Sequence, residues 1–242
     1  MNQPKNRFNG KNLNLRNVRQ APKKPVVKNN KKPVARRLAV SNLPKKTKMV
    51  GNTTLRMWQG DITKLQVGAI VNAADEDLTG GGGIDRIIQN AAGNNVKLQC
   101  KKLSCKLGKA VVTSGGNLPC KKIIHTVGPD LRLDAKDRKG KTLKKNGKVV
   151  KTNNTHKPTK GDIGALVQCY ISCMKECEKN HISSVAFCCL SCGTYGFPKK
   201  EAAEIACNTV KGYIAAHPQT CVKDVVFCAG DKAQLGFYNA AA

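Results

Sequence analysis

Residues 60–93 read GDITKLQVGAIVNAADEDLTGGGGIDRIIQNAAG and hold the most informative pattern of the chain. Four consecutive glycines, Gly80–Gly83, follow an apolar run and precede a segment in which apolar residues recur at helical spacing. Glycine leaves backbone N–H groups uncovered and adopts positive φ, which suits a loop that binds phosphate. The N-terminus of the following helix adds donors and a positive dipole end. A flexible linker is the alternative, but such linkers usually carry serine and connect domains, so we favour a phosphate-binding loop.

The charge of the chain is concentrated in two segments. Its 242 residues carry 43 Lys and Arg against 15 Asp and Glu, a formal net charge of +28. Residues 1–50 contain 15 of the basic residues and no acidic residue, and residues 130–162 contain 11 basic and 4 acidic residues. The remainder carries a net charge of only +6, which is ordinary for a folded domain. We therefore expect one folded domain with two basic appendages.

The first appendage, residues 1–50, is typical of a disordered basic arm, because it is rich in Lys, Arg, Asn and Pro and shows no sustained periodicity. Such an arm attracts nucleic acid and other polyanions with little sequence discrimination. A solvated tail that aids solubility is the alternative, and the sequence leaves both open. The run KNNKKPVARR at residues 28–37 also resembles a nuclear localisation patch.

The composition predicts an intracellular protein of the nucleus or the cytoplasm, without a membrane partner. Residues 1–50 contain no apolar run long enough for a secretory signal, and no segment approaches the ~18 to 20 apolar residues of a membrane span. The twelve cysteines fall at apparent core and helix positions, so we expect free thiols in a reducing compartment. Cys169, Cys173 and Cys177 share one helical face at a spacing that departs from zinc motifs. We interpret them as core residues and expect no metal or cofactor.

Alternating strand and helix patterns predict an α/β domain over residues 51–242, interrupted by a basic insertion at about 130–160. The insertion has only weak hairpin signals, such as Asn146-Gly147. The expected strands cover residues 54–59, 67–72, 109–113, 121–127, 184–190 and 222–229. The expected helices cover residues 84–92, 163–178 and 198–216.

A second glycine-bearing loop, SCGTYG at residues 191–196, follows the near-continuous apolar strand 184–190 and precedes a helix. Ligands of open α/β sheets bind at the carboxyl ends of strands, where such loops gather. We call residues 80–84 the glycine loop and residues 191–196 the second loop, and we expect the two loops to hold a diphosphate from two sides. The glycines match neither the P-loop, which continues into Gly-Lys-Ser/Thr, nor the spaced glycines of dinucleotide-binding domains.

Six motifs taken in order resemble those of macro domains of the MacroD type. They are GDIT at 60–63, AIVNAAD at 69–75, GGGGID at 80–85, AAG at 91–93, KIIHTVGP at 122–129 and SCGTYGFP at 191–198. Their order and separations match that family over residues 53–231. The resemblance implies a three-layer α/β/α fold with a mixed central sheet that binds ADP-ribose in a cleft at the strand ends. Many members of the family also hydrolyse ADP-ribosyl esters on proteins or O-acetyl-ADP-ribose.

The resemblance also assigns roles to individual residues. Asp61 and the backbone N–H of Ile62 would contact the adenine, and Asn72 would belong to the ligand site. One phosphate and the distal ribose would be held by Gly80, Gly81, Gly82, Gly83 and Ile84. The other phosphate would be held by Ser191, Cys192, Gly193, Thr194, Tyr195 and Gly196, with Tyr195 flanking the distal ribose.

Asp85 matches the acid that positions or activates the attacking water in the family. Like charge from bound phosphates would raise its proton affinity, which suits a general base. The alternative is a first-turn residue favoured only by the helix dipole.

Several positions depart from the family pattern. Asp75 replaces an asparagine that contacts the distal ribose, and we keep it beside Asp85 as a candidate catalytic residue. Gln89 replaces a histidine of the active group, and Gly230 falls where many members stack an aromatic ring on the adenine. Cys192 replaces a threonine. We expect either a reactive thiol or a passive loop side chain at this position.

Three functions stay open at this point. The first is an enzyme that hydrolyses ADP-ribosyl esters, with ADP-ribose or an ADP-ribosylated protein as its ligand. The second is a non-catalytic reader of ADP-ribose or poly(ADP-ribose), which the departures at Asp75, Gln89 and Gly230 favour. The third is a module that binds nucleic acid or another polyanion through residues 1–50.

Overall fold

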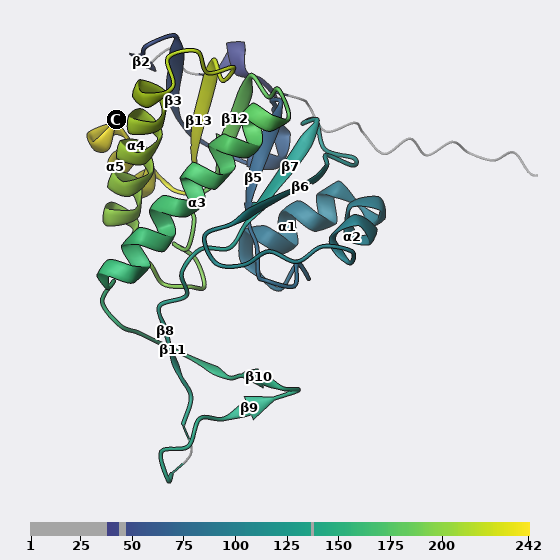
Figure 1. The fold of residues 1–242 in the computed structure, drawn as a ribbon, viewed down its shortest axis with the longest axis vertical. Helices are drawn as coiled ribbons and strands as arrows, with labels where there is room; N and C mark the ends of the chain where they lie inside the picture. Colours follow the sequence, from purple (N-terminus) through teal and green to yellow (C-terminus); the bar gives the residue numbers. More distant parts are fainter. Residues whose placement is uncertain (1–37, 44–46, 137) are drawn as a thin grey trace, which may run out of the picture. The chain divides into compact units, whose positions relative to one another are not determined.

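The computed structural model describes residues 38–43, 47–136 and 138–242. Its centre is a seven-stranded mixed sheet with the order β2-β3-β13-β12-β5-β7-β6 (Figure 1). The strands are β2 (Thr47–Val50), β3 (Thr53–Gln59), β5 (Ala69–Ala73), β6 (Ala110–Ser114), β7 (Lys122–Thr126), β12 (Ser184–Phe187) and β13 (Asp224–Ala229). The five central strands run parallel, and β2 and β6 pair antiparallel at the two edges.

Because the central strands are parallel, their carboxyl ends meet at one edge of the sheet. The register places Ala73 of β5 opposite Thr126 of β7, and Phe187 of β12 opposite Phe227 of β13. The segments that leave these strands therefore start side by side. They include the glycine loop and the loop at residues 191–196, which is how two sequence motifs over a hundred residues apart come together.

Helices cover both faces of the sheet: α1 (Gly83–Ala92), α2 (Asn94–Cys100), α3 (Lys160–Lys179), α4 (Lys199–Ala216) and α5 (Lys232–Ala241). Successive side chains of β7 point to opposite faces. His125 lies against Cys100 of α2, whereas the Thr126 side chain lies near Cys169 of α3. The expected three-layer α/β/α architecture with a mixed sheet is confirmed.

Aromatic rings join the α3 side of the sheet to its covering helices. Tyr170 of α3 lies 5.2 Å from Phe187 between ring centroids, and Phe227 lies 5.2 Å from Tyr238 of α5. These rings are completely or almost completely buried. Cys169, Cys173 and Cys177 of α3 are also fully buried, as expected of core residues.

The basic insertion forms two short antiparallel ladders. β8 (Arg132–Asp134) pairs with β11 (Lys151–Thr155), and β9 (Lys144–Lys145) pairs with β10 (Lys148–Val149). Asn146 and Gly147 both adopt positive φ, 51° and 77°, as a two-residue hairpin turn requires. The weak hairpin signal of the sequence therefore marks a real turn, and Figure 1 shows these ladders beyond the end of α3.

The observed elements differ from the expected ones at several places. The helices α2 and α5 were not expected, and the strand expected over 184–190 ends at Phe187 because the chain turns into the second loop. The short elements β1 (Leu38–Ala39), η1 (Val40–Asn42), η2 (Ile62–Lys64) and β4 (Leu65–Gln66) were not expected either. β2 lies within the expected arm, so the sheet begins before residue 51. Residues 1–37 of that arm lie outside the described residues. None of the described helices has the length and apolarity needed to cross a membrane.

Replacing Phe187 tests the importance of the buried aromatic rings for stability. We expect Phe187→Ala to lower the free energy of unfolding by about 3 to 5 kcal/mol, because the site loses a buried ring and keeps a cavity. Val149→Ala is the matched control, since Val149 is 38% exposed and its loss should change stability by no more than about 0.5 kcal/mol. Urea unfolding followed by circular dichroism measures both, and equal losses would contradict the packing described.

Candidate functional site

A cavity of about 310 Å³ opens at the carboxyl edge of the sheet, a size within the usual range of small-molecule sites. Residues of both predicted loops line it. The complete lining is Ala73, Ala74, Asp75, Gly81, Gly82, Gly83, Ile84, Asp85, Gly128, Arg132, Cys189, Ser191, Gly193, Thr194 and Tyr195. A Cβ atom built on Gly83 would lie 4.0 Å from Thr194 Oγ1, so the loops face each other closely. The geometry agrees with the expectation of two loops around one ligand site.

The glycine loop delivers the N-terminus of α1 to this cavity. Gly80 and Gly83 adopt positive φ, 76° and 52°, whereas Gly82 is extended and precedes the helix without a side-chain cap among the described residues. The first N–H groups of a helix have no partner within the helix. At this helix they are left to a ligand, and the dipole favours an anionic one.

The second loop turns tightly at its start. Ser191 has φ of 61°, and its carbonyl accepts from the Phe197 N–H at 3.0 Å. The Ser191 hydroxyl is buried and has no hydrogen-bond partner among the described residues. A Cβ on Gly128 would lie 2.2 Å from this oxygen, so only glycine fits beside it. The loop thus brings a buried hydroxyl without a partner to the wall of the cavity.

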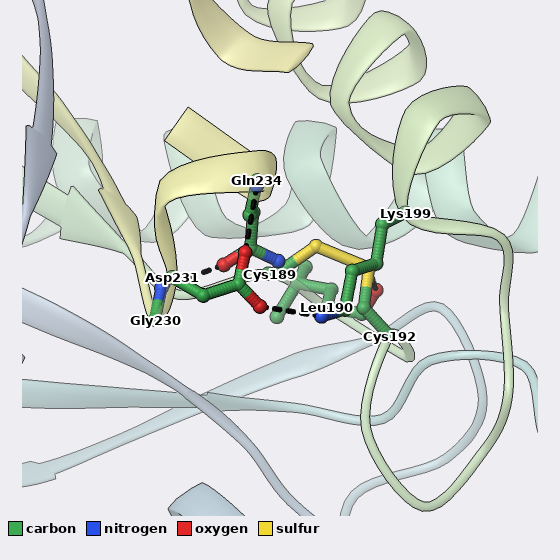
Figure 2. Close-up of a disulfide and its surroundings, with 7 residues drawn as sticks. All are labelled: Cys189, Leu190, Cys192, Lys199, Gly230, Asp231 and Gln234. Atoms are coloured by element: carbon green, nitrogen blue, oxygen red, sulfur yellow. Dashed lines mark hydrogen bonds and ion pairs between the residues drawn. A yellow bond between two sulfur atoms is a disulfide. The ribbon is translucent and has the colours of Figure 1, made fainter. Parts of the chain in front are cut away.

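A disulfide joins Cys189 to Cys192 across the start of this loop (Figure 2). The expectation of free thiols throughout is therefore wrong for these two residues, whereas the other ten cysteines are free. Their Cα atoms lie 5.7 Å apart, a usual separation for a disulfide, because the turn at Ser191 folds the chain back. The C-x-x-C spacing was the signal in the sequence. Cys192 is neither a free nucleophile nor an unattached loop side chain.

Polar contacts hold the next loop beside the disulfide (Figure 2). Lys199 Nζ pairs with Asp231 Oδ2 at 2.6 Å, and Asp231 Oδ1 accepts from the Gln234 N–H at 2.7 Å. The Gly230 N–H donates to Gln234 Oε1 at 2.7 Å. The backbone at Gly230 is thus fixed by α5, although the residue offers no ring to a ligand.

Asp85 is buried in the first turn of α1 and forms part of the cavity wall. Its Oδ1 accepts from Asn72 Nδ2 at 2.7 Å and from Gln89 Nε2 at 3.0 Å. Burial is the main cause that raises the pKa of the Asp85 carboxyl, and the nearby charge of Asp75 adds to it. The sequence led us to expect like charge as the cause, so the direction agrees but the dominant cause differs.

A buried chain of hydrogen bonds orients Asn72 from behind. Asn72 Nδ2 lies 3.0 Å from His125 Nδ1, and His125 Nε2 lies 2.9 Å from Thr113 Oγ1, which donates to the Ser114 carbonyl. Since Asn72 can only donate through this nitrogen, the His125 proton resides on Nε2. Burial lowers the pKa of His125 to about 4, so the ring stays neutral. The histidine is thus a structural relay and not an acid–base group of the cavity.

Asp75 lines the cavity and begins an acidic loop, residues 75–79. Its two carboxylate oxygens accept from the Thr79 N–H at 2.9 Å and from Thr79 Oγ1 at 2.6 Å. The neighbouring Asp77 forms an ion pair with Lys148 of the insertion. The negative charge of this loop is therefore partly offset by a residue more than seventy positions away.

Sequence reasoning missed five cavity residues: Ala73 and Ala74 at the end of β5, and the three residues Arg132, Gly128 and Cys189. Arg132 binds Asp130 through two hydrogen bonds, at 2.9 and 2.7 Å, and its guanidinium lies 5.3 Å from the centroid of the Tyr195 ring. Asp130 raises the pKa of Arg132 and keeps it charged. All three residues follow the carboxyl end of β7 or β12, and that position was the signal that could have found them.

Some residues expected in the site lie outside this cavity. Asp61 caps η2 by accepting from the Thr63 N–H at 2.9 Å, and Ile62 is buried in the core. Asn72 lies behind Asp85 and acts on the site through it. Gly80, Cys192 and Gly196 shape the two loops without lining the cavity.

Comparison with known proteins agrees with this geometry. The family model described as "Macro domain" matches residues 71–150 and 146–206. The chain is 42% identical over 173 residues to the ADP-ribose glycohydrolase MACROD2 of Homo sapiens, covering 71% of the chain. It is 37% identical over 181 residues to a protein-ADP-ribose hydrolase of Staphylococcus aureus, covering 70% of the chain.

The chain belongs to the macro domain family. It spans 35% of the length of the human relative and 60% of the bacterial one. A solved macrodomain of Trypanosoma brucei in complex with ADP-ribose superimposes with a TM-score of 0.66 at 26% identity, covering 85% of this chain and 76% of that one.

The structure shows how this macro domain accommodates its departures from the family pattern. Gln89 donates from Nε2 to both Asp85 Oδ1 and the Leu78 carbonyl, each at 3.0 Å, so it ties the catalytic candidate to the acidic loop. Both carboxylate oxygens of Asp75 accept hydrogen bonds from within its own loop. A Cβ on Gly80 would lie 3.2 Å from the Gln89 side chain, which leaves little room for any other residue there.

The raised pKa of Asp85 predicts how stability depends on pH. A buried carboxyl with a raised pKa contributes stability at low pH that is lost as the pH rises through that pKa. We expect Asp85→Asn to unfold at an equal or higher urea concentration than the wild type at about pH 8, with a gain on the order of 1 kcal/mol. The gain should shrink as the pH falls toward about 4, because the raised pKa means that more of the wild-type carboxyl is then protonated. If the difference in stability between Asp85→Asn and the wild type were smaller at about pH 8 than at about pH 4, the prediction would be wrong.

Proposed function

We propose that this macro domain binds ADP-ribose and hydrolyses ADP-ribosyl esters, either on acidic side chains of proteins or in O-acetyl-ADP-ribose. One observation carries the proposal: a cavity between two loops that offer backbone donors, with the buried carboxylate of Asp85 in its wall. The activities for which the human and bacterial relatives are named, and the ligand of the trypanosome structure, agree with it.

In this proposal the diphosphate lies between the glycine loop and the second loop. The N-terminus of α1 and the N–H groups of Gly193 and Thr194 would take its oxygens, and the Ser191 hydroxyl would gain the partner that it lacks. Tyr195 would flank the distal ribose, and Asp61 and Ile62 would serve the adenine end. Asp75, which lines the cavity, would lie beside the distal ribose as the second catalytic candidate.

Asp85 supplies the acid–base chemistry in the same proposal. Its carboxylate accepts a proton from water while the water oxygen bonds to the ester carbon; the ester C–O bond then breaks as Asp85 returns the proton to the leaving ADP-ribose oxygen, which releases ADP-ribose and the free acid. Asn72 and Gln89 hold the carboxylate in place for this step. The raised pKa makes Asp85 a stronger base, and activity should fall as the pH drops through that pKa.

A non-catalytic reader remains the second candidate. Gln89 provides no imidazole, Asp75 brings a negative charge toward a diphosphate, and Gly230 offers no ring for adenine stacking. These replacements weaken catalysis and adenine binding more than they weaken the diphosphate site. The two candidates differ in one measurable property, the release of ADP-ribose.

Two variants test binding and chemistry separately. Gly82→Val puts a side chain into the cavity, and because Gly82 is extended and has open space around its Cβ position, the fold should tolerate it. We expect calorimetry to show ADP-ribose affinity reduced by at least about tenfold. Asp85→Asn should retain affinity and lose release of ADP-ribose from a glutamate-modified peptide by a factor of about 100 or more.

Gly212→Val is the matched control, since Gly212 is exposed in α4 with open space around it. It should leave binding and release unchanged. Binding without release by the wild type would select the reader, and no binding by the wild type would exclude both candidates.

We also propose that residues 1–50 bind polyanions in an intracellular, nuclear or cytoplasmic setting, because they contain 15 basic and no acidic residues, and 12 of the 15 lie in residues 1–37. RNA affinity measured against salt concentration tests this. Deleting residues 1–37 should flatten the slope of log affinity against log salt, since fewer counterions are released. An unchanged slope would mean that the arm does not bind.

A further inference from the structure

The insertion carries a basic surface that the proposed chemistry does not use. We call residues 135–136 and 138–150 the lysine hairpin; they contain seven Lys and Arg and no acidic residue, and Asp137 between them lies outside the described residues. All seven basic side chains are exposed, among them Lys136, Arg138, Lys144 and Lys145. Backbone hydrogen bonds from the Ala135 N–H to the Val150 carbonyl and from the Val150 N–H to the Leu143 carbonyl, at 2.8 and 2.9 Å, close its base. The hairpin is thus a folded unit that presents charge, and not only a charged run.

Apolar side chains are interspersed with the charges. Leu143 is 42% exposed and Val149 is 38% exposed, and Leu133 in the adjoining β8 is 45% exposed. Residues 130–160 contain no Phe, Tyr or Trp on which a nucleic acid base would stack. A surface of lysines and aliphatic groups without aromatic rings matches an acidic, partly apolar polypeptide better than a nucleic acid.

The insertion that carries the hairpin contacts the cavity at both of its ends. The Leu131 N–H donates to the Tyr195 carbonyl at 3.0 Å, and Arg132, the first residue of β8, lies in the cavity wall over the Tyr195 ring. At the other end of the insertion, Thr155 of β11 packs against Gly196, where a Cβ would meet it at 2.4 Å. In addition, Lys148 of the hairpin pairs with Asp77, two residues from Asp75 at the cavity.

Both ends of the insertion therefore contact the second loop, at Tyr195 and Gly196, and Tyr195 lines the cavity together with Asp75 and Asp85. In the proposed binding mode this part of the cavity is the distal ribose side, from which the modified side chain and its polypeptide leave the cavity. A polypeptide attached there would run toward the lysine hairpin, whose Lys148 pairs with Asp77, two residues from Asp75 of the cavity wall. Free ADP-ribose carries no such polypeptide.

We propose that the lysine hairpin is the docking surface for an acidic, partly apolar segment of the protein that carries the ADP-ribose. The proposal rests on the proposed function, because the cavity must hold the modified group for the segment to reach the hairpin. Exposed charges act over about a Debye length, about 8 Å at physiological salt, so the lysines attract the segment and speed its association. Leu143 and Val149 then supply the contacts that free carboxylates alone would lack.

Two peptides test the proposal. Both carry ADP-ribose on one glutamate; in the first the flanking residues are Asp, Glu and Leu, and in the second Asn, Gln and Leu replace them. At about 50 mM salt we expect wild-type protein to bind the acidic peptide about tenfold more tightly than the neutral one. The difference should nearly vanish at about 500 mM salt, where the charges are screened.

Lys144→Glu/Lys145→Glu should abolish the preference while affinity for free ADP-ribose stays unchanged by calorimetry. Lys121→Glu/Lys122→Glu is the matched control, because it makes the same change of charge in two adjacent lysines at the start of β7, opposite the carboxyl edge of the sheet. The control should keep most of the preference. Thermal unfolding of both variants verifies the fold.

Each outcome decides between the alternatives. If the wild type binds free ADP-ribose but does not distinguish the peptides, or if both variants lose the preference equally, the hairpin proposal is wrong while the proposed function stands. If the hairpin variant loses affinity for an RNA oligonucleotide and not the preference for the acidic peptide, the surface binds nucleic acid instead. If the wild type does not bind ADP-ribose, the proposed function is wrong and the hairpin proposal is rejected with it.

Discussion

The pairing of Asn72 with His125 across β5 and β7 is the interaction on which the site depends. The parallel register puts these two residues opposite each other inside the sheet, and neither can stay buried without a hydrogen-bond partner. His125 is also hydrogen-bonded to Thr113 of β6, and Asn72 donates a hydrogen bond to Asp85 of α1. Three strands and one helix thus share one chain of polar contacts. The carboxylate at its end has a fixed position before any ligand arrives.

The same chain determines the electrostatics of the cavity. Burial raises the pKa of Asp85, but the two amide donors at its Oδ1 work against this rise and keep the charged form accessible. Gln89 therefore acts as one of these donors, and it differs from a histidine because it cannot exchange a proton in the physiological range. A role in orienting Asp85 survives the replacement, whereas a role in proton transfer does not.

Charged residues of both signs lie around the cavity. The acidic loop at Asp75 and Asp77 brings negative charge to one wall, and the basic insertion brings Arg132 and Lys148 to the same region. Asp130 and Asp77 each pair with one of these cations. The basic insertion thus places part of its positive charge beside the site, and most of its other basic residues lie in the lysine hairpin. The disulfide adds a covalent link to the second loop, next to the pair of Lys199 and Asp231 (Figure 2).

The sequence by itself determined the fold class, most of the central strands, and the two loops of the cavity. These depend on local patterns: apolar runs, glycines at turns, and a helix that starts just after them. The Asn146-Gly147 turn was visible for the same reason. The sequence also marked Asp85, because a carboxylate in the first turn after four glycines is a local feature.

Only the tertiary structure decided what depends on partners far apart in the chain. It placed Arg132 over Tyr195, joined Lys148 to Asp77, and put Asn72 behind Asp85 and not in the cavity. It also paired Cys189 with Cys192, although their spacing was visible, because the turn at Ser191 brings their Cα atoms within bonding range. These contacts follow from strand register and loop direction, and no periodicity along the chain encodes either one.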